Sequence, residues 1–261
     1  MLTIAITGSN GEVGKRTVLE ALKDGHSVIG MDQGDEAKLA PGVDEELRKR
    51  FTYKQADLKN RDAFLGAARG SDAMIHLAAV FKKEGVPESS QLPEHVAAYR
   101  ARAGTPPTDL GPEHGMGRRG RTQLELQARA FARKHGMRVA CIRPHWVIPE
   151  SLAYDPEKLA ATGGLANDLW AWTSEGQAAR AFLLGLTAPA STFPEGTSEA
   201  FFVVAPTTVR REPTKNLIKE HFPEVTDWKC DFDGNEGLYD CSKAERMLGW
   251  TERGFPWSPV E

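Results

Sequence analysis

The sequence is poor in cysteine and has no long apolar run. Its three cysteines, Cys141, Cys230 and Cys241, lie far apart, and His-x-His, Cys-x-x-Cys and Gly-x-Ser-x-Gly motifs are absent. The sequence thus gives no motif for a metal site or a hydrolase triad. The odd number of cysteines favours a reducing compartment, which we expect to be the cytoplasm. No segment approaches the roughly 20 apolar residues of a membrane span.

An excess of charge of one sign is also lacking. The net charge is −3, with 33 basic and 36 acidic residues. Such a balance gives no global field that would attract nucleic acid or an anionic membrane. We therefore expect a small-molecule ligand and no nucleic-acid or membrane partner. A chain of 261 residues is long enough to bury a large core.

What the sequence does contain is an apolar run joined to a glycine-rich turn. Residues 2–6 predict a buried parallel strand, and Gly8, Gly11 and Gly14 follow it as Gly-x-x-Gly-x-x-Gly before an amphipathic helix. Backbone N–H groups at the start of that helix can hold a pyrophosphate. The predicted contacts of a dinucleotide with this turn are Gly8, Ser9, Asn10, Gly11, Glu12, Val13 and Gly14.

Two alternatives apply to the same turn. It can be a tight strand-to-helix connection that binds nothing. A P-loop is the other alternative, but Ser9 occupies its first glycine position and Arg16 replaces its magnesium-binding hydroxyl. The strand before the turn and the helix after it favour the dinucleotide interpretation.

An acidic residue follows at the spacing that a dinucleotide site requires. The second predicted strand, residues 26–32, ends in Asp32, about 20 residues beyond the turn, where a carboxylate binds the adenosine ribose hydroxyls. A carboxylate there repels a 2′-phosphate, so NAD is favoured over NADP. Lys15 and Arg16 keep NADP open, and Asp32 can instead cap the next turn.

Two more strand–helix patterns complete the N-terminal half. A third strand runs from Phe51 toward Asp57, Asn60 is placed to cap the next helix, and residues 73–80 form a fourth strand. This alternation predicts an α/β fold with a doubly wound parallel sheet that binds its ligand at the carboxyl ends of the strands. His76, on the fourth strand, is interpreted as a core histidine.

Residues 7–14, Asp32, residues 56–58 and residues 76–79 resemble the cofactor motifs of the NAD-dependent epimerase/dehydratase family, the extended short-chain dehydrogenases. The resemblance implies a Rossmann-type NAD-binding domain over residues 1–149 and a smaller substrate-binding region over residues 150–261, from which strand 201–205 returns to the sheet. The further cofactor contacts that it implies are Asp57, Leu58, Leu77, Ala78, Ala79, Pro144 and Val147.

The family pattern breaks over residues 95–121. The family has a strand that ends in a catalytic serine and then a Tyr-x-x-x-Lys pair, but the tyrosine and lysine positions fall on Gly117 and Arg121. Neither supplies a phenol or an amine. Tyr99 and His145 are the remaining acid/base candidates, and a packing role is the alternative for His145.

We also expect the glycines of this segment to delay the next helix until about Thr122, where Thr122 and Glu125 match a capping box.

The resemblance implies an oxidoreductase or epimerase that moves a hydride between NAD and a carbinol or carbonyl substrate, such as a nucleotide sugar or a small hydroxy or keto compound. A homodimer is compatible with it. The missing pair leaves two alternatives: a dinucleotide-binding sensor or scaffold without the chemistry, or a shortened product of an active parent.

Overall fold

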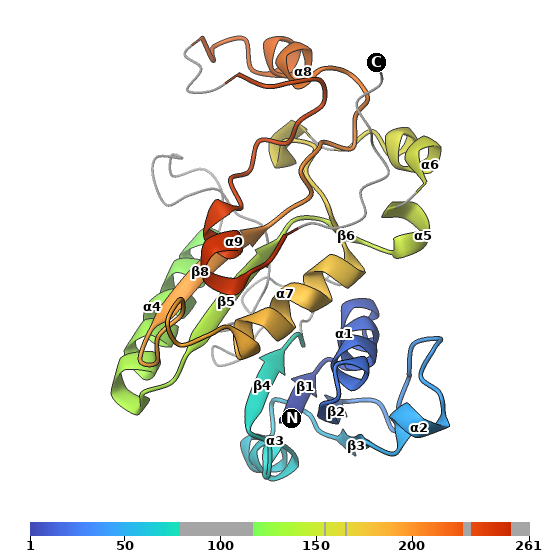
Figure 1. The fold of residues 1–261 in the computed structure, drawn as a ribbon, viewed down its shortest axis with the longest axis vertical. Helices are drawn as coiled ribbons and strands as arrows, with labels where there is room; N and C mark the ends of the chain where they lie inside the picture. Colours follow the sequence, from blue (N-terminus) through green and yellow to red (C-terminus); the bar gives the residue numbers. More distant parts are fainter. Residues whose placement is uncertain (79–116, 154, 165, 227–230, 252–261) are drawn as a thin grey trace.

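The fold is described from a computed structural model, which describes residues 1–78, 117–153, 155–164, 166–226 and 231–251, with the backbone alone for residues 117–124 (Figure 1). The N-terminal elements are β1 (Thr3–Thr7), α1 (Glu12–Lys23), β2 (Ser27–Asp32), α2 (Glu45–Arg48), β3 (Phe51–Gln55), α3 (Arg61–Ala68) and β4 (Ala73–His76). The later elements are α4 (Gly117–His135), β5 (Val139–Pro144), β6 (Val147–Ile148), α5 (Glu150–Ala153), α6 (Pro156–Ala161), the 3-10 helix η3 (Ala166–Asp168), β7 (Thr173–Ser174), α7 (Glu175–Thr187), β8 (Ser198–Val203), α8 (Thr214–His221) and α9 (Ser242–Leu248).

The N-terminal strands form one parallel sheet in the order β3-β2-β1-β4. This order confirms the predicted Rossmann-type arrangement, because the first strand is central and the crossovers run outward from it. The third and fourth strands end earlier than predicted, at Gln55 and His76. The chain turns after β3, where the N–H of Asn60 donates to the carbonyl of Asp57 at 2.9 Å. Asn60 caps α3 as predicted.

In the described part of the chain, the strands form separate sheets and no strand joins β4 to β5. β4 pairs with β1, β5 pairs with β8, and the short strands β6 and β7 pair with each other. The β5–β8 pair is parallel too, so β8 pairs with a strand of the predicted first domain. The predicted boundary after residue 149 falls between β6 and α5.

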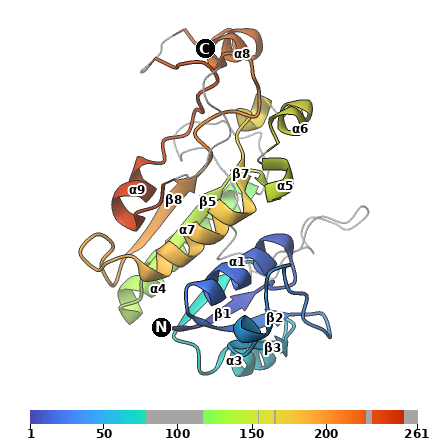
Figure 2. The same cartoon turned by 45° about the vertical axis from the view of Figure 1, so that its right-hand side comes forward.

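Helix packing joins the two sheets in place of strand pairing. Helix α7 lies across the β5–β8 sheet and packs against α1 (Figure 2). One core cluster includes Ile4 and Val18 from the first half together with Phe182 and Phe201 from the second. Burial of apolar surface is thus what holds the halves together. Near the chain's end, Trp250 fixes α7 by donating its indole N–H to the carbonyl of Gln177 at 3.1 Å.

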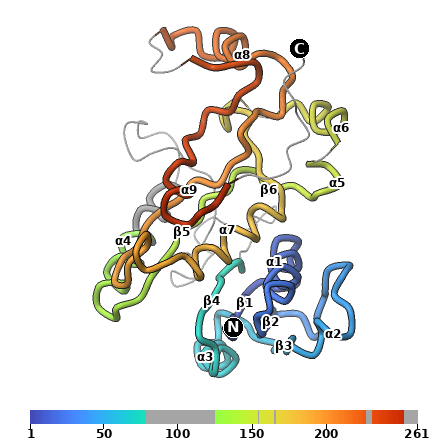
Figure 3. Tube along the Cα trace, viewed as in Figure 1, coloured from blue at the N-terminus to red at the C-terminus, as the bar shows by residue number. Residues whose placement is uncertain are grey.

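A second core lies at the far end of the molecule from β1–β4, where α5, α6 and α8 gather (Figure 3). It includes Leu159, Trp170, Trp172 and Leu217. Both tryptophans are therefore packing residues. None of the helices in the described ranges is long and apolar enough to cross a membrane.

The predicted start of α4 was wrong. The helix begins at Gly117, five residues before Thr122. Glycine costs a helix about 1 kcal/mol relative to alanine, but tertiary packing overrides so weak a preference, and α4 packs against β5 and β8. The predicted capping box was also wrong, because Thr122 lies inside α4 and not at its N-terminus. The carboxylate of Glu125 binds the guanidinium of Arg143.

Candidate cofactor-binding site

The glycine turn between β1 and α1 is packed too closely for side chains at two of its positions. Gly8 has a φ of +68°, and a Cβ atom there would lie 2.8 Å from the backbone nitrogen of Ala78. A Cβ atom at Gly14 would lie 2.0 Å from the carbonyl oxygen of Gly8. Only glycine fits both positions without a shift of the backbone. The turn thereby brings the start of α1 directly against the ends of β1 and β4.

Gly11 leaves the start of α1 open. It is the N-cap residue, and no side chain caps the helix. Its position is exposed, and a Cβ atom there would meet only the carbonyl oxygen of Gly8, at 3.3 Å. Helix N-terminal N–H groups that no side chain caps, together with the positive end of the helix dipole, suit an anion such as a pyrophosphate. The geometry of this turn therefore fits a dinucleotide.

Two predicted contacts, Ser9 and Asn10, direct their side chains into the protein. The Ser9 hydroxyl is buried 3.1 Å from the place that a Cβ atom on Gly30 would take. The Asn10 amide donates to the carbonyl of Glu36 at 2.9 Å and accepts from the N–H of Lys38 at 2.8 Å. The Asn10 side chain thus holds the turn to the loop after β2. The backbone of both residues is left for a ligand.

Asp32 stands at the carboxyl end of β2, beside the glycine turn. One carboxylate oxygen accepts from the N–H of Asn10 at 3.0 Å, and the other accepts from the N–H of Gln33 at 2.8 Å. Asp32 therefore does cap the following turn. Each carboxylate oxygen has a second acceptor position, so the same side chain can also accept from ribose hydroxyls. Burial, and then the negative charge of Asp32, raises the pKa of the neighbouring Tyr53 hydroxyl.

The basic residues of α1 are engaged elsewhere. The Lys15 ammonium lies 2.8 Å from the Glu12 carboxylate, and Arg16 lies 3.1 Å from Glu20 and 3.7 Å from Glu150. The structure thus gives both cations carboxylate partners, which weakens the argument that kept NADP open. The contact between Arg16 and Glu150 also ties α1 to the segment that follows β6.

The adenosine-side residues lie around the same turn. The carbonyl oxygen of Thr7 accepts from the N–H of Leu77 at 3.2 Å, and its hydroxyl accepts from the N–H of Ala78 at 3.3 Å. Asp57 is exposed and accepts from the N–H of Lys59 at 2.9 Å, and Leu58 follows it. His76 is buried 2.8 Å from the Thr7 hydroxyl, which confirms it as a core histidine.

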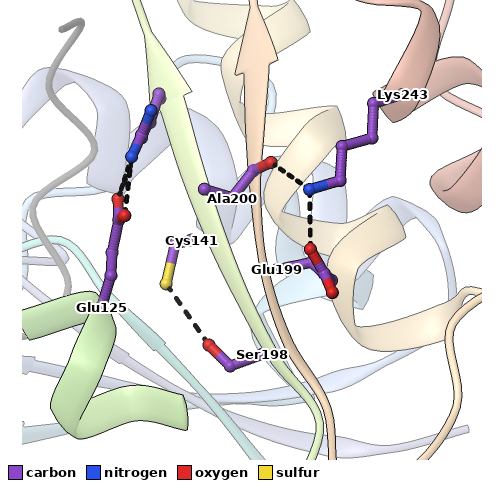
Figure 4. Close-up of polar contacts among 7 residues, drawn as sticks. Glu125, Cys141, Ser198, Glu199, Ala200 and Lys243 are labelled. Atoms are coloured by element: carbon purple, nitrogen blue, oxygen red, sulfur yellow. Dashed lines mark hydrogen bonds and ion pairs between the residues drawn. The ribbon is translucent and has the colours of Figure 1, made fainter. Parts of the chain in front are cut away.

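The residues predicted to border the nicotinamide lie at the end of the β5–β8 sheet. Pro144 ends β5 and Val147 begins β6. Just before them, the Arg143 guanidinium holds the Glu125 carboxylate of α4 with contacts of 2.6 and 2.9 Å (Figure 4). The same figure shows the neighbouring Cys141–Ser198 contact at 3.9 Å.

His145, between Pro144 and Val147, is buried, with its Nε2 atom 2.9 Å from the Tyr239 hydroxyl. Sequence reasoning missed Tyr239, because 94 residues separate it from His145 and no motif marks it.

For the remaining predicted site residues, the structure describes the backbone at most. Ala79 and Tyr99 lie outside the described residues, while Gly117 and Arg121 fall in the first turns of α4. No group of three or more His, Cys, Asp or Glu residues in the described ranges could hold a metal ion. His145 is thus the one acid/base candidate from the sequence whose side-chain contacts are described.

The glycine turn, Asp32 and the order of the first sheet are the features expected of a dinucleotide site. Residues 4–106 match the model of the NAD dependent epimerase/dehydratase family. The chain is similar to that family over this part. No curated protein matched the sequence.

Solved structures of epimerases share the fold of this chain at low sequence identity. A UDP-glucose-4-epimerase from Stenotrophomonas maltophila with bound NAD and formylated UDP-arabinopyranose has a TM-score of 0.58 and 16% identity, over 97% of this chain and 94% of that one. A UDP-N-acetylglucosamine 4-epimerase from Bacillus cereus has a TM-score of 0.59 and 17% identity, over 98% of this chain and 94% of that one. A UDP-glucose 4-epimerase from Thermotoga maritima with UDP-glucose has a TM-score of 0.57 and 17% identity, over 96% of this chain and 94% of that one.

Proposed function

We propose that this protein binds NAD at the glycine turn and acts as an epimerase or oxidoreductase on a carbinol or carbonyl substrate. The observation that carries the proposal is the packing of the turn, where Gly8 and Gly14 admit no side chain and α1 has no side-chain cap. A nucleotide sugar is the substrate class that the similar structures support, because two of those epimerases hold UDP-linked sugars.

In this proposal, different residues bind different parts of the cofactor. The α1 N-terminus would hold the pyrophosphate, Asp32 the adenosine ribose and Asp57 the adenine amino group, while Pro144 and Val147 would border the nicotinamide. The bound dinucleotide supplies a hydride acceptor and donor. The protein must orient the substrate, exclude water and move the hydroxyl proton. Asp32 supports NAD over NADP, because its negative charge opposes a 2′-phosphate.

A carboxylate at the open position of the turn provides the test. Titration with NADH should enhance nicotinamide fluorescence for the wild-type protein, and Gly11→Asp should abolish the effect by placing a negative charge where the pyrophosphate binds. Gly66→Asp is the matched control, because Gly66 is exposed on α3 and a Cβ atom there meets no atom within 4 Å. Equal binding by Gly11→Asp and wild type would reject the turn as the cofactor site.

A dinucleotide-binding sensor or scaffold is the second candidate. It is favoured by the divided sheet and by Gly117 and Arg121 at the family's tyrosine and lysine positions. Incubation with NAD and a panel of alcohols and nucleotide sugars separates the candidates. NADH binding with no turnover would support the sensor, whereas turnover would support the enzyme.

A further inference from the structure

We propose that His145 and Tyr239 form a proton-transfer pair at the carboxyl end of the β5–β8 sheet, which takes the hydroxyl proton of a carbinol substrate. This proposal rests on the function proposed above, and it gives the sequence candidate His145 a hydroxyl partner in place of the missing Tyr-x-x-x-Lys pair. It assigns a role to Tyr239, whose segment carries no catalytic motif.

The contact geometry joins the two side chains. The His145 Nε2 atom lies 2.9 Å from the Tyr239 hydroxyl oxygen, and the rings are tilted by 58° with centroids 5.0 Å apart. His145 is only 4% exposed, and its backbone N–H donates to the Thr173 hydroxyl at 3.2 Å. That hydroxyl donates in turn to the carbonyl of Val203 at 2.6 Å. The histidine backbone is therefore linked through Thr173 of β7 to β8.

Tyr239 occupies the more accessible end of the pair. It is half-buried, and its ring packs against that of Phe202 at a centroid distance of 5.3 Å. Burial, and then the negative charge of Asp168, raises the pKa of Tyr239 to about 12. The hydroxyl therefore keeps its proton at neutral pH and can donate it to an imidazole nitrogen. Among the described groups, Asp168 is the charge that faces Tyr239 from the neighbouring η3 segment.

The backbone next to Asp168 is strained. Leu169 and Trp170 have φ values of 54° and 51°, in the left-handed region that residues other than glycine rarely adopt. Surrounding contacts hold this conformation, because Trp170 is buried against the rings of His221 and Phe222 and its carbonyl accepts from the N–H of Val209 at 2.9 Å. Strain of this kind gathers at functional sites. Here it lies directly after Asp168, the carboxylate that acts on Tyr239.

The pair also lies at the appropriate end of the fold. His145 directly follows β5, and ligands of parallel α/β sheets bind at the carboxyl ends of the strands. Five residues beyond His145, Glu150 contacts Arg16 of α1 at 3.7 Å. The segment that carries His145 is thus tied to the helix that begins at the glycine turn.

The proton steps balance. The carbinol O–H bond breaks as its proton passes to the Tyr239 oxygen, while the Tyr239 proton passes to Nε2 of His145 and forms an imidazolium. The hydride that leaves the carbinol carbon is taken up by the oxidised dinucleotide of the proposed function. Tyr239 is neutral before and after the transfer, so its high pKa does not oppose the step.

Histidine NMR tests the coupling without any substrate. In protein labelled with ¹⁵N-histidine, Tyr239→Phe removes one oxygen atom, so we expect it to move the titration midpoint of His145. His135→Gln, on the exposed end of α4, is the matched control and should leave that midpoint unchanged. An unchanged midpoint in Tyr239→Phe would overturn the pair.

Turnover then tests the catalytic role, with NAD plus either propan-2-ol or UDP-glucose as the probe. Tyr239→Phe and His145→Gln should each lower turnover by about 10²-fold or more, while NADH binding stays at the wild-type level. Wild-type protein that binds NADH but turns over neither probe, or variants that keep wild-type turnover, would overturn the pair and leave the cofactor site standing. Wild-type protein that does not bind NADH would reject the proposed function itself.

Discussion

The carbonyl oxygen of Gly8 lies 2.0 Å from the position that a Cβ atom on Gly14 would occupy. Gly14→Ala must therefore move the backbone of α1 or of the turn. Forced overpacking costs about 1–3 kcal/mol, so the variant should unfold at a lower temperature and bind NADH more weakly.

The control for this prediction is Gly66→Ala, in α3. A Cβ atom at Gly66 meets no atom within 4 Å, and alanine favours a helix over glycine by up to about 1 kcal/mol. Thermal unfolding followed by circular dichroism should show the two variants shifting in opposite directions. Unchanged stability of Gly14→Ala would contradict the packing of the turn.

The charge of Asp32 should decide between NADH and NADPH. Asp32→Asn removes a negative charge while keeping a polar side chain beside Asn10 and Gln33. We expect the affinity for NADPH relative to NADH to rise about tenfold, which corresponds to ~1.4 kcal/mol. Fluorescence titration with both nucleotides measures the ratio, with Asp62→Asn on the exposed face of α3 as control. A ratio that does not change in Asp32→Asn would remove Asp32 as the selector.

The ion pair between Arg143 and Glu125 should stabilise the second sheet. Their side chains are 16% and 29% exposed, and the guanidinium also lies over the ring of Phe202. Glu125→Gln leaves the arginine without its charged acceptor and should lower the free energy of unfolding by about 1.5–3 kcal/mol. Urea unfolding measures it. The control, Glu46→Gln, breaks an exposed pair with Lys49 and should lower the free energy of unfolding by at most about 1 kcal/mol. Equal losses in the two variants would refute the stabilising role of the Arg143–Glu125 pair.

Cys141 should react slowly in the folded protein. Burial, and then the negative charge of Glu125, raises the pKa of its thiol to about 11. The thiolate is the nucleophile, and the thiol of an unfolded chain has a pKa of about 8.5. At pH 8, iodoacetamide should therefore modify Cys141 at least about tenfold more slowly in the folded protein than in the urea-unfolded chain. Peptide mapping by mass spectrometry measures both rates, and similar rates would contradict the shift.

The raised pKa of the Cys141 thiol also makes the stability of the fold depend on pH. The folded state holds its proton more tightly than the unfolded state, so the group destabilises the fold only as the pH rises from the unfolded value toward 11. Cys141→Ser should reduce that alkaline loss of stability.

The separation of β4 from β5 in the described part of the chain leads to a prediction about the transcript. In the described part of the chain β4 and β5 each pair with one strand, which leaves facing edges without the strand that the family pattern places there. If the chain is a shortened product, sequencing between the codons for His95 and Arg121 should find an additional in-frame segment that contains Ser and Tyr-x-x-x-Lys. An unaltered transcript would establish the divided sheet as the protein's own arrangement.

The local features of the N-terminal half were predictable from the sequence. Apolar runs followed by glycine or asparagine signals located β1, β2 and the cap of α3 at Asn60, because short-range sterics and hydrogen bonding decide those features. Local propensity failed at α4, which begins at Gly117 although glycine disfavours a helix. It also failed at Thr122, which lies inside that helix, while Glu125 binds Arg143 from β5.

The sequence by itself determined the glycine-rich turn, the parallel α/β class of the first sheet and the absence of the family's Tyr-x-x-x-Lys pair, because each is carried by local patterns in the chain. Only the tertiary structure decided that Ser9 and Asn10 face inward, that Lys15 and Arg16 are engaged by carboxylates, and that His145 meets Tyr239 across 94 positions. Those outcomes depend on contacts between distant segments, which the burial of a shared apolar core brings together.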